Sequence, residues 1–267
     1  MSGSHSGSPY PVAHKSVHDY FSAFAIVKPC AWMKHENIEI AIKPCDIQRI
    51  NSNSIILCDQ YSNRVYSYQR DKSILKLLYV MDNCTAYRNR IVFNEQDNCL
   101  YIWSERKNKF ILLDIDTNTL RQSTNCTVLH VATLNAEREI PLCNMVNVNG
   151  NIHLFGGPSS NHHFYLNTQE NELVELPEID RFHSHITGAS AIYVPQQQNI
   201  YMIGGYNTNV NLMNGQVIVY DAVMCQWNRI GSCWKDMYEP QMAVTFDGNY
   251  IIIVNSPSTE IYVMEVS

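Results

Sequence analysis

Two pairs of histidines are the residues of this chain whose types and spacing could hold a metal ion. They are the adjacent His162 and His163, and His183 and His185 further along. Paired imidazoles with an open coordination position suit zinc, copper or iron. However, the sequence has no HExxH motif, no CxxC pair and no flanking pattern of carboxylates. We therefore expect polar loop histidines and no functional metal.

Motifs for covalent or phosphate chemistry are also missing. The sequence contains no GxSxG, no P-loop and no GxGxxG, the motifs that mark a serine nucleophile, a phosphate cradle and a dinucleotide site. We expect no catalytic residues and no cofactor, so the chain is predicted not to be an enzyme.

The composition of the 267 residues bounds the possible partners. Hydrophobic residues make up 45%, enough for a sizeable core, and the net charge is −6. Surfaces that neutralise nucleic-acid phosphates are basic, so we expect no nucleic-acid partner. No apolar run of about 18 residues is present, so we expect no membrane span and no membrane partner. The start of the chain does not read as a signal peptide. Nine cysteines without a CxxC pair favour a reduced, cytoplasmic protein.

An internal repeat organises most of the chain. The unit is clearest at Asn199–Trp227, where an apolar run is followed by a double glycine and a second apolar run. The residues that correspond to Asn199 are Ser54, Cys99, Asn151 and Asn249, at successive steps of 45, 52, 48 and 50 residues along the chain. A period near 50 residues is typical of a β-propeller blade.

Each unit is predicted to be a four-stranded antiparallel sheet. Short apolar runs separated by Asn, Asp and Gly are signals of β-hairpins. The first strands are predicted at Ile47–Ile50, Ile91–Phe93, Met145–Val148, Ala191–Val194 and Met242–Phe246. The weaker fourth strands are predicted near Leu75–Leu78, Leu120, Leu173–Leu176 and Trp227–Ile230. The fold class is therefore all-β, a β-propeller of four-stranded antiparallel blades.

The fourth unit resembles a kelch repeat. Gly204-Gly205 match the kelch double glycine, and Tyr220 followed by Trp227 matches its aromatic pair. The third unit resembles it in part, through Gly156-Gly157. The first, second and fifth units have Asp59-Gln60, Ser104-Glu105 and Val254-Asn255 instead. The resemblance implies a structural role for the glycines and aromatics, and a protein partner such as a ligase substrate, an actin filament or a signalling protein.

The predicted domain is a propeller over residues 21–267, after a disordered segment at residues 1–20. Its units lie near residues 46–80, 88–123, 143–178, 188–231 and 241–267. The fifth unit ends at its third strand, Glu260–Glu265. An N-terminal strand, from Ile38–Ile42 or Phe21–Val27, is expected to close a ring of five blades, because a propeller leaves no open sheet edge. The alternative is an incomplete array of six or seven blades.

The connection Tyr206–Gly215 is predicted to be a recognition loop. It is seven residues longer than its counterparts in the other units and carries apolar residues without an obvious core role. A second aromatic loop is Gly231–Pro240. The predicted partner-binding residues are Tyr206, Asn207, Asn209, Asn211, Met213, Trp234, Tyr238, Arg106, His162, His163 and His183.

The predicted function is a non-catalytic protein-interaction module that binds its partner through loops on one face. In a propeller the loops after the second and fourth strands of a blade open on the same face, so the histidines of the third unit could meet there. The alternative is therefore a small-molecule or metal-dependent enzyme with its site in the central pocket. Known kelch-type propellers include copper oxidases and sialic-acid mutarotases, and fold alone does not separate these functions.

Overall fold

The structure of the protein is a computed structural model. It describes residues 44–50, 54–59, 64–69, 74–80, 90–104, 109–115, 127–130, 144–157, 160–170, 172–179, 185–213, 215–232, 236–238, 240–245, 247–255 and 260–266. All of these belong to one compact unit, Ala41–Ser267. The predicted disorder of residues 1–20 and both candidate closing strands, Phe21–Val27 and Ile38–Ile42, lie outside the described residues. The described part of the chain contains no helix long and apolar enough to cross a membrane.

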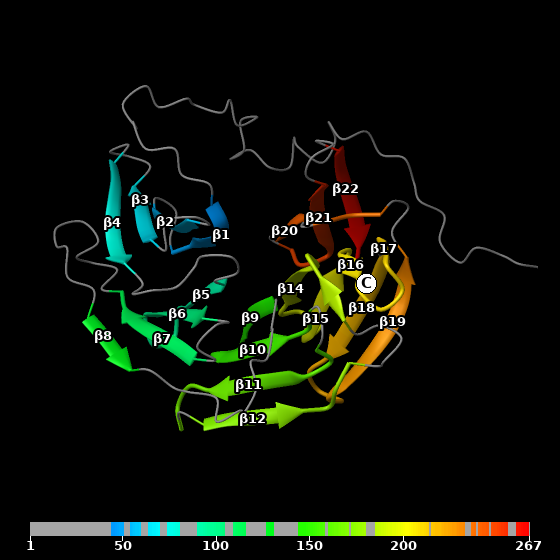
Figure 1. Cartoon of the computed structure of the whole chain (residues 1–267), viewed down its shortest axis with the longest axis horizontal. Helices are drawn as coiled ribbons and strands as arrows, with labels where there is room; N and C mark the ends of the chain where they lie inside the picture. The colour runs from blue at the N-terminus through cyan, green and yellow to red at the C-terminus, as the bar shows by residue number, and fades with distance from the viewer. Residues whose placement is uncertain are drawn as a thin grey trace, which may run out of the picture. The chain divides into compact units, whose positions relative to one another are not determined.

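The described residues form successive antiparallel sheets, which we call blades one to five (Figure 1). The first is β1 (Pro44–Arg49), β2 (Ser54–Asp59), β3 (Arg64–Gln69) and β4 (Ile74–Val80). The second is β5 (Arg90–Asn94), β6 (Cys99–Ser104), β7 (Lys109–Asp114) and β8 (Thr127–His130). The third is β9 (Asn144–Val148), β10 (Asn151–Phe155), β11 (His163–Asn167) and β12 (Glu172–Leu176).

The fourth and fifth blades complete the described series. The fourth is β14 (Ser190–Val194), β15 (Asn199–Ile203), β18 (Gln216–Asp221) and β19 (Gln226–Ser232). The fifth is β20 (Gln241–Val244), β21 (Tyr250–Asn255) and β22 (Glu260–Glu265). Four of the five second strands begin at the repeat residue aligned with Asn199, and β21 begins one residue after it. The predicted third strand Glu260–Glu265 is confirmed residue for residue.

Tight turns set the register of the first two strands in the second, third and fourth blades. Asn98 and Gln198 directly precede β6 and β15 with φ of 57° and 56°. In the third blade the two-residue turn Asn149-Gly150 has φ of 50° and 93°. Asparagine and glycine tolerate this left-handed backbone, which a tight hairpin requires. The turn residues that signalled hairpins in the sequence therefore form them.

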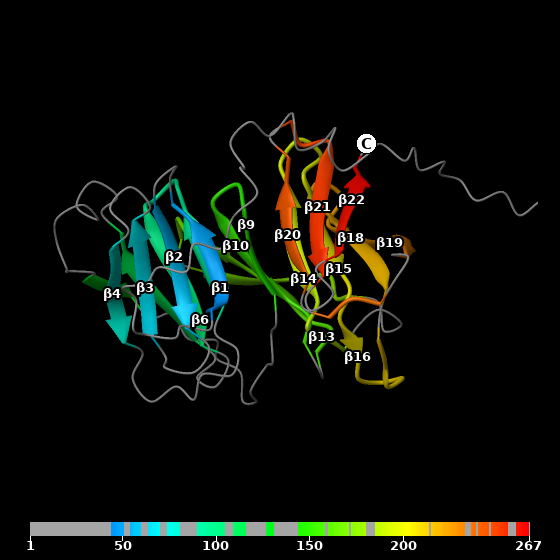
Figure 2. The ribbon, with the colours of Figure 1, turned by 90° about the horizontal axis from the view of Figure 1, so that it is seen from above.

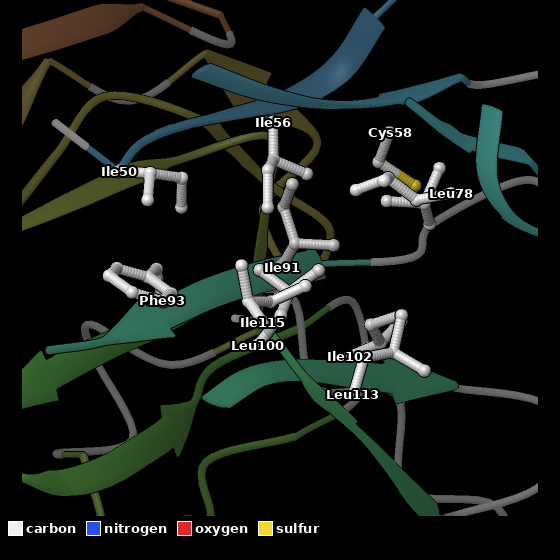
Figure 3. Packing of buried hydrophobic residues seen from close by; sticks show 11 residues of the cluster. Ile50, Ile56, Cys58, Leu78, Ile91, Phe93, Leu100, Ile102, Leu113 and Ile115 are labelled. Atoms are coloured by element: carbon white, nitrogen blue, oxygen red, sulfur yellow. The ribbon is translucent and has the colours of Figure 1, made fainter. Parts of the chain in front are cut away.

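The core lies between neighbouring blades. Along β15, Ile200 and Met202 pack toward the third blade, whereas Tyr201 and Ile203 pack toward the fifth. Successive side chains of a strand point to opposite faces, so the second, third and fourth blades bury apolar residues on both faces. Figure 3 shows this packing between the first two blades, where Ile56 and Ile91 point toward one another.

The first strands of successive blades also lie side by side. β1 contacts β5, β5 contacts β9, β9 contacts β14, and β14 contacts β20. Sheets that pack face to face with their first strands adjacent are the blades of a propeller. The predicted all-β class with four-stranded antiparallel blades is confirmed.

The fourth strand of the second blade differs from its prediction. We expected it near Leu120, but the strand that pairs with β7 is β8, Thr127–His130. Asp114 pairs with Thr127, whereas the corresponding Asp221 of the fourth blade pairs with Gln226 after a short turn. The prediction fails here because the connection between β7 and β8 is longer than its counterpart in the fourth blade, and the unit extends beyond residue 123.

The double glycine after β15 is required by both backbone conformation and space. Gly204 and Gly205 have φ of 75° and 93°. A Cβ on Gly205 would lie 2.8 Å from the backbone nitrogen of Ala189 and 2.9 Å from the backbone oxygen of Thr187. The Gly205 amide also donates to the Met237 carbonyl at 2.6 Å. These contacts turn the chain out of the blade toward residues 206–213.

Replacing Gly205 with alanine should therefore lower the free energy of unfolding by about 2–4 kcal/mol, because strain and backbone overlap add. The matched control is Gly231→Ala in β19 of the same blade, where an added Cβ meets nothing within 4 Å. Chemical denaturation should show a change of under about 0.5 kcal/mol for the control. Equal effects of the two substitutions would contradict this role of the double glycine.

Candidate interaction face on the third and fourth blades

The long connection of the fourth blade is a hairpin rather than a loop. β16 (Tyr206–Asn207) pairs with β17 (Leu212–Met213), and β13 (Ile186–Thr187) adds a third strand beside β16. In Figure 2, β13 and β16 lie beyond the ends of β14 and β15. Our prediction of an irregular loop at Tyr206–Gly215 was wrong in this respect, because a four-residue turn with positive φ at Asn211 closes two short strands.

Asn207 holds the turn of this hairpin. Its side chain is buried, and its Oδ1 accepts from the backbone amides of Asn209 at 2.9 Å and Val210 at 3.3 Å. At the tip, the Tyr206 hydroxyl donates to Asn211 Oδ1. Asn207 was predicted to contact a partner. Its burial makes it a structural residue instead, because a side chain enclosed by its own turn presents little surface.

The residues that remain at the tip are exposed and partly apolar. Val210 and Leu212 are 60% and 63% exposed, and Asn209 and Asn211 are also exposed. Neither Val210 nor Leu212 belongs to a described core cluster. The hairpin therefore presents two apolar side chains from a turn held by hydrogen bonds. Of the predicted Met213, the structure describes the backbone only.

Hydrogen bonds join the hairpin to the third blade through His185. The Thr208 amide and hydroxyl both donate to the His185 carbonyl, at 3.0 and 3.1 Å. The His185 amide in turn donates to the Ser160 carbonyl at 3.3 Å. Ser160 belongs to the loop before β11, and the carbonyl of Asn161 in the same loop accepts from the Ile179 amide at 2.9 Å. The loop before β11 and the hairpin are thus parts of one connected surface.

Tyr238 belongs to the same surface. It is 37% exposed, and its ring covers Gly188, where an added Cβ would lie 2.4 Å from the ring. We call this surface the hairpin face and define it by residues 160–162, His185, residues 206–212 and Tyr238. It unites the predicted residues Tyr206, Asn209, Asn211, Tyr238 and His162. Arg106, His183 and Trp234 lie outside the described residues.

His163 is buried in the contact between the third and fourth blades and is not a loop residue. Its side chain is 0% exposed, and the indole nitrogen of Trp227 donates to its Nδ1 at 3.2 Å. An indole nitrogen can only donate, so Nδ1 is unprotonated and Nε2 carries the hydrogen. Nε2 then donates to Nδ1 of the buried His153 at 2.9 Å. The predicted binding role of His163 is therefore corrected to a structural one.

The two aromatic residues of the repeat enclose this histidine pair. Tyr220 and Trp227 lie opposite one another in β18 and β19, with ring centroids 5.1 Å apart. The His163 ring meets Tyr220 edge to face at 4.5 Å. Burial favours the neutral imidazole and lowers the pKa of His153 from 6.5 to about 4. Burial, together with the neighbouring His153, also lowers the pKa of His163.

His162 has different surroundings from its neighbour in the sequence. Its Nδ1 lies 3.3 Å from Glu175 Oε1 and 3.6 Å from Glu178 Oε1, with all three side chains partly exposed. Its ring stacks on Phe164 at 5.7 Å. Adjacent residues point to opposite sides of an extended chain, so His162 and His163 do not converge on one metal. Glu175 and Glu178 do not flank His162 in the sequence, so the pattern of neighbouring carboxylates could not predict their approach.

Comparison with known proteins identifies the fold alone. No family model and no curated protein matches the chain. Among solved structures it is similar to virginiamycin B lyase from Staphylococcus aureus, with 12% identity and a TM-score of 0.56 over 84% of this chain and 70% of that chain. It is also similar to a Lactobacillus plantarum protein, with 12% identity and a TM-score of 0.58 over 85% and 69%. Both are β-propeller proteins, so the chain has a β-propeller fold.

Acidification should destabilise the protein through His153. Its pKa is lower in the folded chain than the ordinary 6.5, so between about pH 6.5 and 4 the unfolded chain binds more protons. The stabilisation is fully present above this window and is lost as the pH falls through it. His153→Gln keeps an acceptor for His163 but does not titrate. Urea unfolding should show that the stability lost between about pH 7 and 4.5 is smaller in this variant by about 2 kcal/mol. Equal losses would contradict the buried neutral pair.

Proposed function

We propose that this β-propeller is a non-catalytic protein-binding module and that its partner docks on the hairpin face. The observation that carries the proposal is the hairpin tip, where Val210 and Leu212 are exposed while the turn beneath them is held by Asn207 and His185. An apolar pair on an ordered support, beside the aromatic Tyr238, is suited to bind a partner rather than to transform it.

The energetics favour such a contact. Burying a Val or Leu side chain contributes about 1.5–3 kcal/mol. Binding also costs the ordering of the interface, and that cost is smaller where the contact surface is already in place. The bonds from Asn207 to residues 209 and 210, and from Thr208 to His185, order the hairpin before binding. Polar groups around the apolar pair, including Asn209 and Asn211, complete a typical interface with a polar rim.

The charge of the face indicates the chemistry of the partner. Glu175, Glu178 and Asp236 are exposed at or near the face, and the chain has a net charge of −6. Complementary charge steers association and excludes wrong partners. We therefore propose a protein partner whose contact surface has an apolar centre flanked by lysine or arginine.

We also propose that the propeller is of the kelch type and works in a reducing, cytoplasmic setting. In support of the type, Gly204-Gly205 end β15 at positive φ, and Tyr220 and Trp227 pack between the third and fourth blades. In support of the setting, Cys225 is an exposed free thiol. Exposed free thiols persist where disulfide formation is disfavoured.

The lyase activity named for the Staphylococcus aureus structure remains a property of that protein. At 12% identity the likeness supports a shared fold, and one propeller fold supports many functions. The predicted convergence of His162 and His163 on one ion has no support, because His163 is enclosed in the core while His162 is partly exposed.

The proposal predicts that Val210→Ser with Leu212→Ser removes specific partners from the intact protein. Affinity capture followed by quantitative mass spectrometry measures this loss, which should be at least about tenfold if burial of the pair contributes 1.4 kcal/mol or more. The hairpin itself should remain folded, because neither side chain belongs to a described core cluster.

The matched control is Val223→Ser with Met224→Ser. These residues are 66% and 62% exposed in the turn between β18 and β19 of the same blade, away from the hairpin face. The control removes a similar apolar surface and should leave the set of partners unchanged. Partners lost only in the control, or in neither variant, would refute the assignment of the face.

A further inference from the structure

A side-chain cluster at the end of the third blade contains one imidazole and two carboxylates. His162 directly precedes β11, Glu175 is in β12, and Glu178 follows β12. One ligand atom from each residue lies within 4.8 Å of the other two. We propose that His162, Glu175 and Glu178 form a binding site for a divalent transition-metal ion, with zinc as the best-fitting ion. This inference does not require the proposed partner, whose basic flanks would meet Glu175 and Glu178 in the metal-free protein.

The two separations from the His162 nitrogen match those around a tetrahedral ion. Zinc bonds to histidine nitrogen and carboxylate oxygen are about 2.0–2.2 Å long, which places ligand atoms about 3.3–3.6 Å apart. Glu175 Oε1 and Glu178 Oε1 lie 3.3 and 3.6 Å from His162 Nδ1. Both carboxylates approach the same ring nitrogen, so an ion needs only small side-chain movements to be held by all three.

Neighbouring contacts orient two of the three ligands. Asn161 Nδ2 donates to Glu178 Oε2 at 2.5 Å, which leaves Oε1 directed toward His162. The His162 ring stacks on Phe164, and the His162 amide donates to Ser160 Oγ at 3.2 Å. Contacts that fix ligand orientation strengthen metal binding, and their loss typically weakens it about 10–100-fold.

Charge and ligand type select the class of ion. Two carboxylates carry a charge of −2, which a divalent cation balances. One nitrogen and two oxygens suit Zn²⁺, Co²⁺ or Mn²⁺ and do not suit Cu⁺, which prefers sulfur. The side chains of His162, Glu175 and Glu178 are 38%, 59% and 51% exposed. The fourth coordination position therefore opens to solvent, where water can fill it.

The test is a titration of the intact, tag-free protein with Zn²⁺ after treatment with a chelator. A competing weak chelator in the buffer suppresses loose binding by other histidines and cysteines of the chain. His162→Gln and Glu178→Gln should each bind one equivalent less than the wild type, or bind that equivalent at least tenfold more weakly. Co²⁺ should give the visible absorption of a tetrahedral site in the wild type and lose it in both variants.

The control is Glu172→Gln. It removes an exposed carboxylate that lies in β12, the strand of Glu175, but outside the cluster. It should bind as the wild type does. Thermal unfolding without metal checks that each variant folds. If the His162→Gln variant does not fold, Glu178→Gln still tests the site. The same Zn²⁺ stoichiometry and affinity in the wild type and in either folded ligand variant would overturn the proposal.

Discussion

Apolar packing between neighbouring blades is the interaction on which the rest of this structure depends. The strands β15 and β18 show it most clearly, because each sends alternate side chains to the blade before and the blade after. In β18, Ile218 and Tyr220 join the cluster with the third blade, and Val217 and Val219 join the cluster with the fifth. A single sheet cannot bury both of its faces, so each blade is stabilised by its neighbours. The repeat in the sequence follows from this requirement.

The polar chain from Trp227 through His163 to His153 is built into this packing. Buried imidazoles cost free energy unless their nitrogens are paired. Here the indole N–H of Trp227 donates to His163, and His163 donates to His153. These two bonds fix the tautomer of His163. Function is proposed where the structure leaves this regular plan. Gly204 and Gly205 direct the chain out of the blade, and the hairpin that follows exposes Val210 and Leu212.

The sequence predicted the blades well because their signals are local. Apolar alternation and turn residues located the starts of the second strands. In the fifth blade they also predicted both ends of the third strand, Glu260–Glu265. The departures required contacts that are distant in the sequence. The hairpin depends on β13, some twenty residues before it, and on the His185 carbonyl. The position of β8 was not predicted because more residues separate it from β7 than separate the third and fourth strands of the first, third and fourth blades.

The candidate site was predicted only in part for the same reason. The insertion length identified Tyr206–Gly215 as the distinctive segment, and the structure places Tyr238 and His162 on the same face. The burial of His163 depends on Tyr220 and Trp227 of the fourth blade, which are distant in the sequence. The approach of Glu175 and Glu178 to His162 depends on strand pairing between β11 and β12, in which Phe164 lies opposite Glu175. That register cannot be read from either segment alone.

The central claim is that a partner contacts the hairpin tip, and site-specific photo-crosslinking tests it most directly. A photoreactive amino acid placed at Leu212 of the intact protein should give a covalent adduct with a partner protein under illumination. The same group placed at the equally exposed Met224 should give none. Adducts from Met224 alone, or the same adducts from both positions, would contradict the account.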